Sequence, residues 1–131
     1  MHTVINPPDL GAPKGYSHAV VSYGGKTVYL AGQTAQRRDG SLSGENLVEQ
    51  YDMAARNVMT ALRAAGGEPQ HLVAMQVFVT DVSEYRASRS KLRDVWLAHF
   101  GDHYPAMALL GVRELFDPNA LVELMAVAVI P

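Results

Sequence analysis

The order of patterned segments in the sequence predicts an α+β fold, in which two helices cover one face of a single mixed sheet. Short β-prone runs alternate along the chain with two segments whose apolar residues recur at steps of three and four, the period of an amphipathic helix. The β-prone runs lie at residues 18–31, 71–80, 107–116 and 120–130, and the helical segments at 45–65 and 81–100. The predicted order is therefore β-β-α-β-α-β-β, after a short strand near residues 3–5.

The first β-prone segment predicts a tight hairpin. It reads HAVVSYGGKTVYLA, with Gly24 and Gly25 at the point of reversal. Two glycines suit a two-residue turn because both central positions of such a turn take a positive φ. In that register Val21 faces Val28 on the side of the core. The polar stretch that follows, residues 36–43, predicts a loop.

Both helices have recognisable ends. We expect Ser43 to cap the first helix and Gly66 with Gly67 to end it in a left-handed conformation. Asp81 followed by Glu84 resembles the capping box that opens a helix, and the second helix should end at Gly101. The apolar residues that should face the core include Tyr51, Val58 and Leu62 in the first helix and Tyr85, Leu92, Trp96 and Phe100 in the second.

The strands are more apolar than one layer of helices requires. The run at 71–80 is apolar on both faces, and so is the run at 120–130 apart from Glu123. The last two runs predict a long hairpin joined through residues 117–119. Because two helices cover only one side of the sheet, the other side predicts an interface between copies of the chain.

The bulk properties exclude several classes of function. A chain of 131 residues fits one domain, residues 1–131, and its net charge of -2 favours neither nucleic acid nor an anionic membrane surface as a partner. It has no cysteine, no secretory leader pattern and no apolar stretch of transmembrane length, so we expect a cytoplasmic protein.

No motif for a metal or a cofactor is present. The sequence lacks a phosphate-binding loop, a dinucleotide fingerprint, a zinc-type His/Glu pair and a nucleophile elbow. His99 and His103 are four residues apart, but Gly101 and Pro105 interrupt the helix that would bring their rings together. We therefore expect neither a metal nor a cofactor.

Glu123 is the most unusual candidate for chemistry, because it is a carboxylate within a core-like run. A buried carboxylate with a raised pKa makes a general acid or base. The alternative is structural: a three-residue loop at 117–119 would place Arg113 opposite Glu123 as a cross-strand ion pair.

Two further sites carry weaker signals. Tyr16 and Ser17 follow Pro13-Lys14-Gly15, where a loop could present a phenol and a hydroxyl to a cleft. Gly32, at the end of a strand, permits close approach of a ligand to the backbone, or it simply ends the strand.

Five segments together resemble the Rid family, also called the YjgF/UK114 family. They are APKGYSHAV at 12–20, YLAGQT at 29–34, EQYDMAARNVMTALRAAGG at 49–67, MQVFVTD at 75–81 and PAMALLGVRELFDPNALVELMAVAV at 105–129. The resemblance implies a chorismate-mutase-like fold of the bacillus type, assembled as a homotrimer with ligand clefts between subunits. In deaminating members these clefts hydrolyse imines or enamines without metal or cofactor.

The resemblance also implies roles for individual residues. The family's tyrosine corresponds to Tyr16, its glycine to Gly32 and its water-positioning glutamate to Glu123, with Ser17 beside the tyrosine. Two positions depart from the pattern: Met107 stands where the family has a carboxylate-binding arginine, and Arg93 falls where it has an asparagine. A methionine is an apolar filler and cannot bind a carboxylate.

Three functions remain to be compared. The first is a homotrimer that binds a small carboxylate or imine-type metabolite, with Met107 arguing against deamination of simple imino acids. The second is an active imine or enamine deaminase with an altered substrate, in which Glu123 acts on water and Arg93 binds the anion; an exposed helix arginine is the plainer interpretation of Arg93. The third, a role with RNA or a protein partner, finds no support in an acidic chain.

Arg113 is a poor substitute for the family's carboxylate-binding arginine, since six strand residues place it about 20 Å from Met107.

Overall fold

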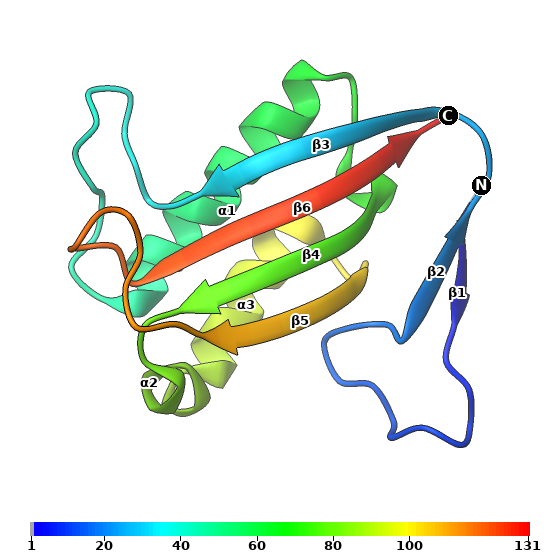
Figure 1. Ribbon diagram of the computed structural model, residues 1–131, viewed down its shortest axis with the longest axis horizontal. Coiled ribbons are helices and arrows are strands. Elements are labelled where there is room, and N and C mark those ends of the chain that lie inside the picture. The colour runs from blue at the N-terminus through cyan, green and yellow to red at the C-terminus, as the bar shows by residue number, and fades with distance from the viewer. Residues whose placement is uncertain (1) are drawn as a thin grey trace.

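The computed structural model describes residues 2–131 (Figure 1). Its strands are β1 (His2–Ile5), β2 (Ala19–Ser22), β3 (Lys26–Gln33), β4 (Leu72–Val79), β5 (Ala106–Gly111) and β6 (Val122–Ile130). Its helices are α1 (Leu47–Ala64), the short 3-10 helix η1 (Pro69–His71), α2 (Val82–Ala87) and α3 (Arg89–Phe100). The strand predicted near residues 3–5 is confirmed.

The main sheet has four strands in the order β3-β6-β4-β5. β6 runs antiparallel to β3 and β4, whereas β5 runs parallel to β4, so the sheet is mixed as predicted. α1 and α3 lie together behind one face (Figure 1). The predicted α+β fold, with helices on one face of a mixed sheet, is confirmed.

The core lies between the sheet and the two helices. From Met75 to Val79 in β4 and from Val122 to Ala128 in β6, every second residue is buried on the face that carries the helices. The sheet contributes Met75, Val77, Val79, Val122, Leu124, Ala126 and Ala128, and the helices contribute Tyr51, Val58, Leu62, Leu92, Trp96 and Phe100. Burial of these apolar side chains is the main stabilising contribution to the packing of the two layers.

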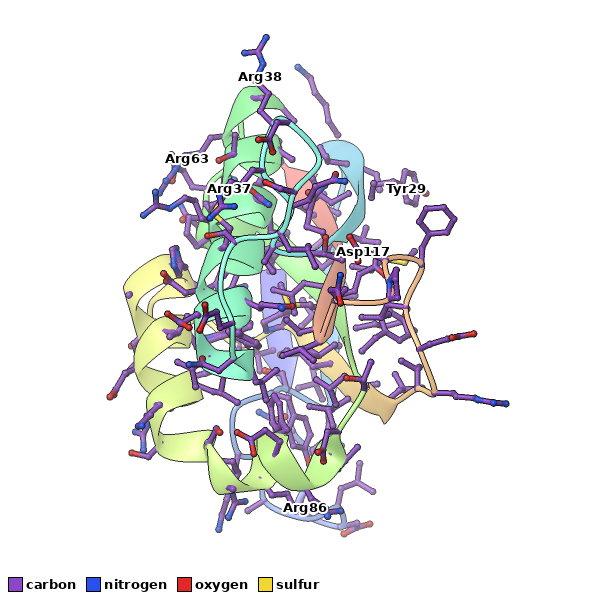
Figure 2. The ribbon with its side chains drawn as sticks, turned by 90° about the vertical axis from the view of Figure 1, so that its left-hand side faces the viewer. Tyr29, Arg37, Arg38, Arg63, Arg86 and Asp117 are labelled. Carbon is purple, nitrogen blue, oxygen red and sulfur yellow. The ribbon has the colours of Figure 1, made fainter. Side chains whose placement is uncertain are left out.

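Among the residues that the structure describes, no helix covers the opposite face of the sheet, called here the outer face (Figure 1). Tyr29 is 80% exposed and projects away from α1 (Figure 2), and Met125 is 46% exposed in the middle of the sheet. Leu110 and Phe78 lie opposite each other on β5 and β4 on the same face. This is the apolar face that the strand pattern indicated.

The helix ends agree with the sequence only in part. Gly66 follows α1 with a φ of 90° and Gly101 follows α3 with a φ of 69°, as predicted. The cap of α1 is Asn46, whose side chain accepts a hydrogen bond from the Glu49 N–H at 2.9 Å, so the expectation for Ser43 was wrong. Ser43 instead donates its backbone N–H to Ala35. Asn46 and not Ser43 caps the helix because Asn46 directly precedes the first helical turn.

The predicted second helix is two helices. Asp81 caps α2 by accepting the Glu84 N–H at 3.0 Å, but the helical path breaks at Ser88, where φ is -103° and ψ is 9°. Residues 86–91 have no large apolar side chain to pack on the sheet. Tertiary packing therefore does not hold one straight helix across the break.

The predicted hairpin of residues 18–31 was wrong in its pairing. Gly24 and Gly25 do take positive φ values of 56° and 74°, yet β2 pairs with β1 and β3 pairs with β6. The β1–β2 ribbon lies to one side of the four-stranded sheet (Figure 1). Turn residues determine local backbone angles, whereas strand partners are decided by competition among all strands.

The predicted hairpin of the last two strands was also wrong. β6 lies between β3 and β4, and residues 112–121 carry the chain from β5 past the end of β4 (Figure 1). Glu123 is therefore opposite Phe78, and the cross-strand pair with Arg113 does not form. Within residues 2–131 the ion pairs are Arg63–Glu68 and His99–Asp52. Sequence adjacency suggested a neighbour that the sheet order does not provide.

Candidate functional site

The structure places the predicted site residues in two groups. Tyr16, Ser17, Arg93 and Met107 line one cavity of about 820 Å³, called here the helix-side cavity. Gly32 and Glu123 are in contact with each other but do not line it. No local pattern separates these residues, and the faces of the sheet decide the division.

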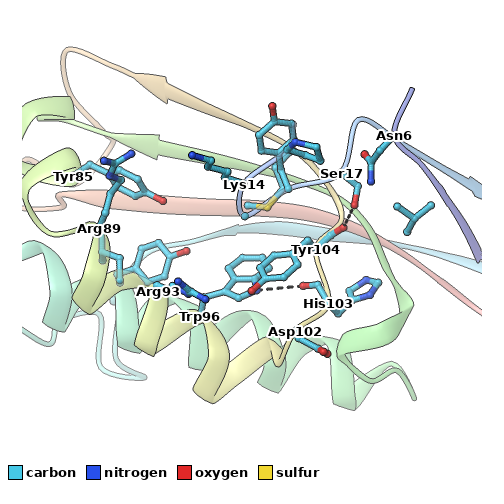
Figure 3. A pocket seen from close by; sticks show the side chains of 17 residues that line it. Asn6, Lys14, Ser17, Tyr85, Arg89, Arg93, Trp96, Asp102, His103 and Tyr104 are labelled. Atoms are coloured by element: carbon cyan, nitrogen blue, oxygen red, sulfur yellow. Dashed lines mark hydrogen bonds between the residues drawn. The ribbon is translucent and has the colours of Figure 1, made fainter. Parts of the chain in front are cut away.

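The helix-side cavity lies between the loop of residues 13–17, helices α2 and α3, and the beginning of β5 (Figure 3). The loop is held by Ser17, which is 5% exposed. Its hydroxyl donates to the Tyr104 carbonyl at 2.5 Å, and its N–H donates to the Pro105 carbonyl at 3.0 Å. Ser17 thus anchors the loop and its hydroxyl hydrogen is already used within the protein.

Tyr16 is positioned by the same loop. Its ring meets the His18 ring edge to face, with centroids 5.2 Å apart, and His18 is bonded through Nε2 to the Gly11 carbonyl at 2.6 Å. The phenol of Tyr16 is therefore held at the wall of the cavity by neighbouring ring and backbone contacts.

Three cations face the helix-side cavity. Arg89 and Arg93 are four residues apart on α3, and Lys14 comes from the loop on the other side (Figure 3). Sequence analysis identified Arg93 through the family pattern but missed Arg89 and Lys14. The spacing of four between two arginines on one helix face was the available signal.

Tyrosines close the inner end of the cavity. Tyr51 is 2% exposed, and burial, followed by its contact with Tyr85, raises the pKa of its hydroxyl above the usual range. Burial also raises the pKa of Tyr85, while a hydrogen bond with Tyr51 and the charge of Arg89 oppose that shift. Both phenols stay protonated at neutral pH and act as hydrogen-bonding groups.

Met107 has the place expected of an apolar wall residue. It is paired with Met75 across β5 and β4, and it packs against the core from the cavity side. Because directly paired residues of neighbouring strands point to the same face, Met107 faces the helices, as Met75 does. It offers the cavity a flexible apolar surface and no charge.

Glu123 and Gly32 form the second group, on the outer face. The ladder between β3 and β6 is irregular between Leu30 and Gln33, so Gly32 lies in a bulge. The Glu123 carboxylate lies directly over Gly32, and a side chain at that position would collide with Oε2. Glycine at 32 thus leaves room for the carboxylate, and its φ is not positive.

The two groups lie on opposite faces of one sheet. Glu123 is paired with Phe78 and points away from the helices, whereas Met107 points toward them. A sheet separates the carboxylate from the helix-side cavity, so one copy of the chain does not bring Glu123 and Met107 into the same pocket.

The histidines do not form a metal site. Within residues 2–131 no three His, Asp or Glu side chains gather in a way that could hold a metal ion. His99 is bonded to Asp52 at 2.6 Å, and His103 is bonded to the Leu72 carbonyl at 2.7 Å. Among the described helices, none is long and apolar enough to cross a membrane.

Comparison with known proteins decides the family. The family model described as Endoribonuclease L-PSP matches residues 8–130. YyfB from Yersinia pestis, a solved structure of the conserved Rid protein family, superposes with a TM-score of 0.88 at 30% identity, covering 98% of each chain. This chain belongs to the Rid family.

Other Rid relatives are similarly distant in sequence. A goat protein named 2-iminobutanoate/2-iminopropanoate deaminase is 30% identical over 115 residues, which cover 87% of this chain and 79% of the relative. The structure of RidA from the bacterium Psychrobacter is 30% identical and covers 92% of both chains, with a TM-score of 0.70. At equal identity, the backbone of this Rid chain is more similar to YyfB than to that RidA.

Proposed function

We propose that this Rid protein is a homotrimer that binds a small carboxylate or imine-type metabolite in clefts between subunits, and that it does not deaminate simple imino acids. The observation that carries the proposal is the placement of Met107 and Glu123 on opposite faces of the sheet. A cleft that contains both residues needs a second copy of the chain. The exposed apolar outer face supports the same assembly.

The chemistry of such a cleft follows from its residues. The Glu123 carboxylate can hold and deprotonate a water molecule, and the bulge at Gly32 leaves backbone groups outside the ladder for a ligand. Neither group binds the carboxylate of an imino acid, which is the task of a guanidinium fork. With Met107 in place of the family's arginine, the small imino acids in the goat relative's name have no guanidinium at this position to bind their carboxylate.

The second candidate function is imine hydrolysis with a different substrate. Arg93 lines the same cavity as Met107 and Tyr16, and this placement favours it as the replacement anion-binding group. Water would add to the imine carbon while Glu123 takes its proton. The proton would then pass to the nitrogen, which gives a carbinolamine. Transfer of the hydroxyl proton to the same nitrogen, with cleavage of the carbon–nitrogen bond, would yield a carbonyl compound and ammonia.

One assay separates the two functions. Imines derived from 2-aminoacrylate are generated in situ, and ammonia release is measured with wild type, Glu123→Gln and Met107→Arg. We expect the rate of ammonia release with wild type to equal the uncatalysed rate, and the rate with Met107→Arg to exceed it. Substantial turnover by wild type that Glu123→Gln abolishes would overturn the first proposal and establish the second.

A further inference from the structure

We propose that the helix-side cavity takes an aryl carboxylate, an anion with an aromatic body, in place of a three- or four-carbon imino acid. The inference rests on the proposed function, because it specifies the ligand class of that cleft. It depends on the charge, the rings and the size of the cavity. The charge indicates an anion, and the rings and the size indicate a larger ligand than the relatives' names describe.

The charge of the cavity is positive although the chain is acidic overall. Lys14, Arg89 and Arg93 line it, and Asp102 is the sole carboxylate among its lining residues. None of the three cations takes part in an ion pair within residues 2–131. Two arginines at a spacing of four also repel each other along a helix. An anionic ligand would relieve this repulsion and neutralise charges that the protein leaves unpaired.

The rings of the cavity are held rigidly by the protein itself. Trp96 and Tyr104 stack with an angle of 9° between their planes and 6.0 Å between centroids. The Trp96 Nε1–H donates to the His103 carbonyl at 3.2 Å, so the polar group of the indole already has a partner within the protein (Figure 3). With Leu92 and Met107 beside them, these rings form a largely apolar wall. Such a wall favours an aromatic or extended apolar body.

The size of the cavity agrees with its chemistry. Its volume of about 820 Å³ lies in the range of pockets that hold ligands of many non-hydrogen atoms, about 300–1,000 Å³. A three-carbon acid that reached Arg93 would leave the ring wall in contact with water. An aryl carboxylate can place its carboxylate at Arg89 and Arg93 and its ring against the apolar wall. In this arrangement Met107 is a recognition residue for the apolar body.

The experiment compares three unreactive probes by isothermal titration calorimetry: 3-phenylpropanoate, its amide 3-phenylpropanamide, and propanoate. We expect wild type to bind 3-phenylpropanoate at least about tenfold more tightly than either other probe, since one charge and one ring each contribute about that factor. Arg93→Gln and Arg89→Gln should remove most of the preference of the acid over the amide. Lys91→Gln lies between them on α3, outside the cavity lining, and should match wild type.

The outcomes distinguish this inference from the function on which it rests. Equal affinity for 3-phenylpropanoate and propanoate, or an unchanged preference in both arginine variants, would overturn the aryl carboxylate while leaving a ligand cleft in place. If neither acid binds and light scattering gives a monomer, both the ligand class and the proposed function are wrong. Circular dichroism of the variants confirms that lost binding is not lost folding.

Discussion

Glycines 25 and 32 show how one residue type meets two different requirements. Gly25 has a φ of 74°, and a side chain there would meet the backbone carbonyl of Ile130. Gly32 has no such backbone restriction and is limited by the carboxylate of Glu123. The first glycine therefore serves the fold, and the second serves the placement of a functional group.

Alanine at these two positions should separate stability from function. Gly25→Ala should lower the free energy of unfolding by about 2 kcal/mol or more, because it combines a left-handed backbone with a collision against main chain. Gly32→Ala should cost less than about 1 kcal/mol, because the end of the Glu123 side chain can rotate away. Urea denaturation measures both changes, and equal losses would contradict this assignment.

Tyr51 is a second residue whose environment has a measurable consequence. Its pKa is raised in the folded protein, so its stabilising contribution is complete below the unfolded value of about 10 and is lost as the pH rises above it. The free energy of unfolding should fall with pH above about 10 by up to about 1.4 kcal/mol per unit more in wild type than in Tyr51→Phe. Tyr29→Phe, at an exposed position, should keep the wild-type slope; an unchanged slope in Tyr51→Phe would refute the prediction.

Among the elements, α1 holds the segment that leads into β6. Gln50 is 3% exposed, and its side chain donates to the Asn119 carbonyl at 3.1 Å and accepts the Leu121 N–H at 2.8 Å. These bonds satisfy backbone groups immediately before the strand that carries Glu123. The helix thus helps to set where β6 begins.

Replacing Gln50 with leucine keeps the approximate size of the side chain and removes all of its side-chain hydrogen bonds, including one to the Gly44 carbonyl at 3.4 Å. Gln50→Leu should lower the free energy of unfolding by about 2–3 kcal/mol, because the Leu121 N–H is left buried without a partner. Gln70→Leu, at an exposed position in η1, should change it by less than about 0.5 kcal/mol. Chemical denaturation followed by tryptophan fluorescence measures both, and comparable values for the two variants would count against the role of Gln50.

For the whole molecule, the unpartnered outer face is the main feature. Met125, in the middle of that face, and Leu97, on the solvent side of α3, are similarly exposed at 46% and 39%. Their exposure does not distinguish them, but their surroundings do. Met125 lies on the sheet face that also carries Phe78 and Leu110, whereas Leu97 follows Arg93 and Asp94 by one turn of α3.

The proposed assembly predicts different effects of a charge at these two positions. Wild type should elute with a mass about three times the 14.2 kDa of one chain. Met125→Lys should dissociate the trimer, because it places an unpaired charge in the buried interface. Leu97→Lys should leave the mass unchanged. Size-exclusion chromatography with light scattering measures all three, and a monomeric wild type would remove the basis of the clefts between subunits.

Predictions from the sequence succeeded where a signal is local. The Asp81 cap and the glycines that end α1 and α3 each depend on residues a few positions apart, and each is observed. Strand pairing failed twice because both hairpins were inferred from neighbours along the chain. β2 pairs with β1 in place of β3, and β6 lies between β3 and β4 in place of pairing with β5.

The candidate site shows the same division. The family pattern named Tyr16, Gly32, Arg93 and Glu123 by position, but Arg89 and Lys14 enter the cavity only through the folded arrangement of α3 and the loop before β2. The residues that line a pocket are brought together by contacts between distant segments. Local sequence patterns therefore do not predict how many residues line the pocket or which face of the sheet each one occupies.

By itself the sequence determined the layer architecture and the helix ends at glycine, because each depends on composition or on short-range spacing. The resemblance to the Rid family identified Met107 at the position of an arginine. Only the tertiary structure decided the order of the strands and the separation of Met107 from Glu123. Which face of a sheet a residue occupies depends on the register with its neighbours, and register is a property of the whole folded chain.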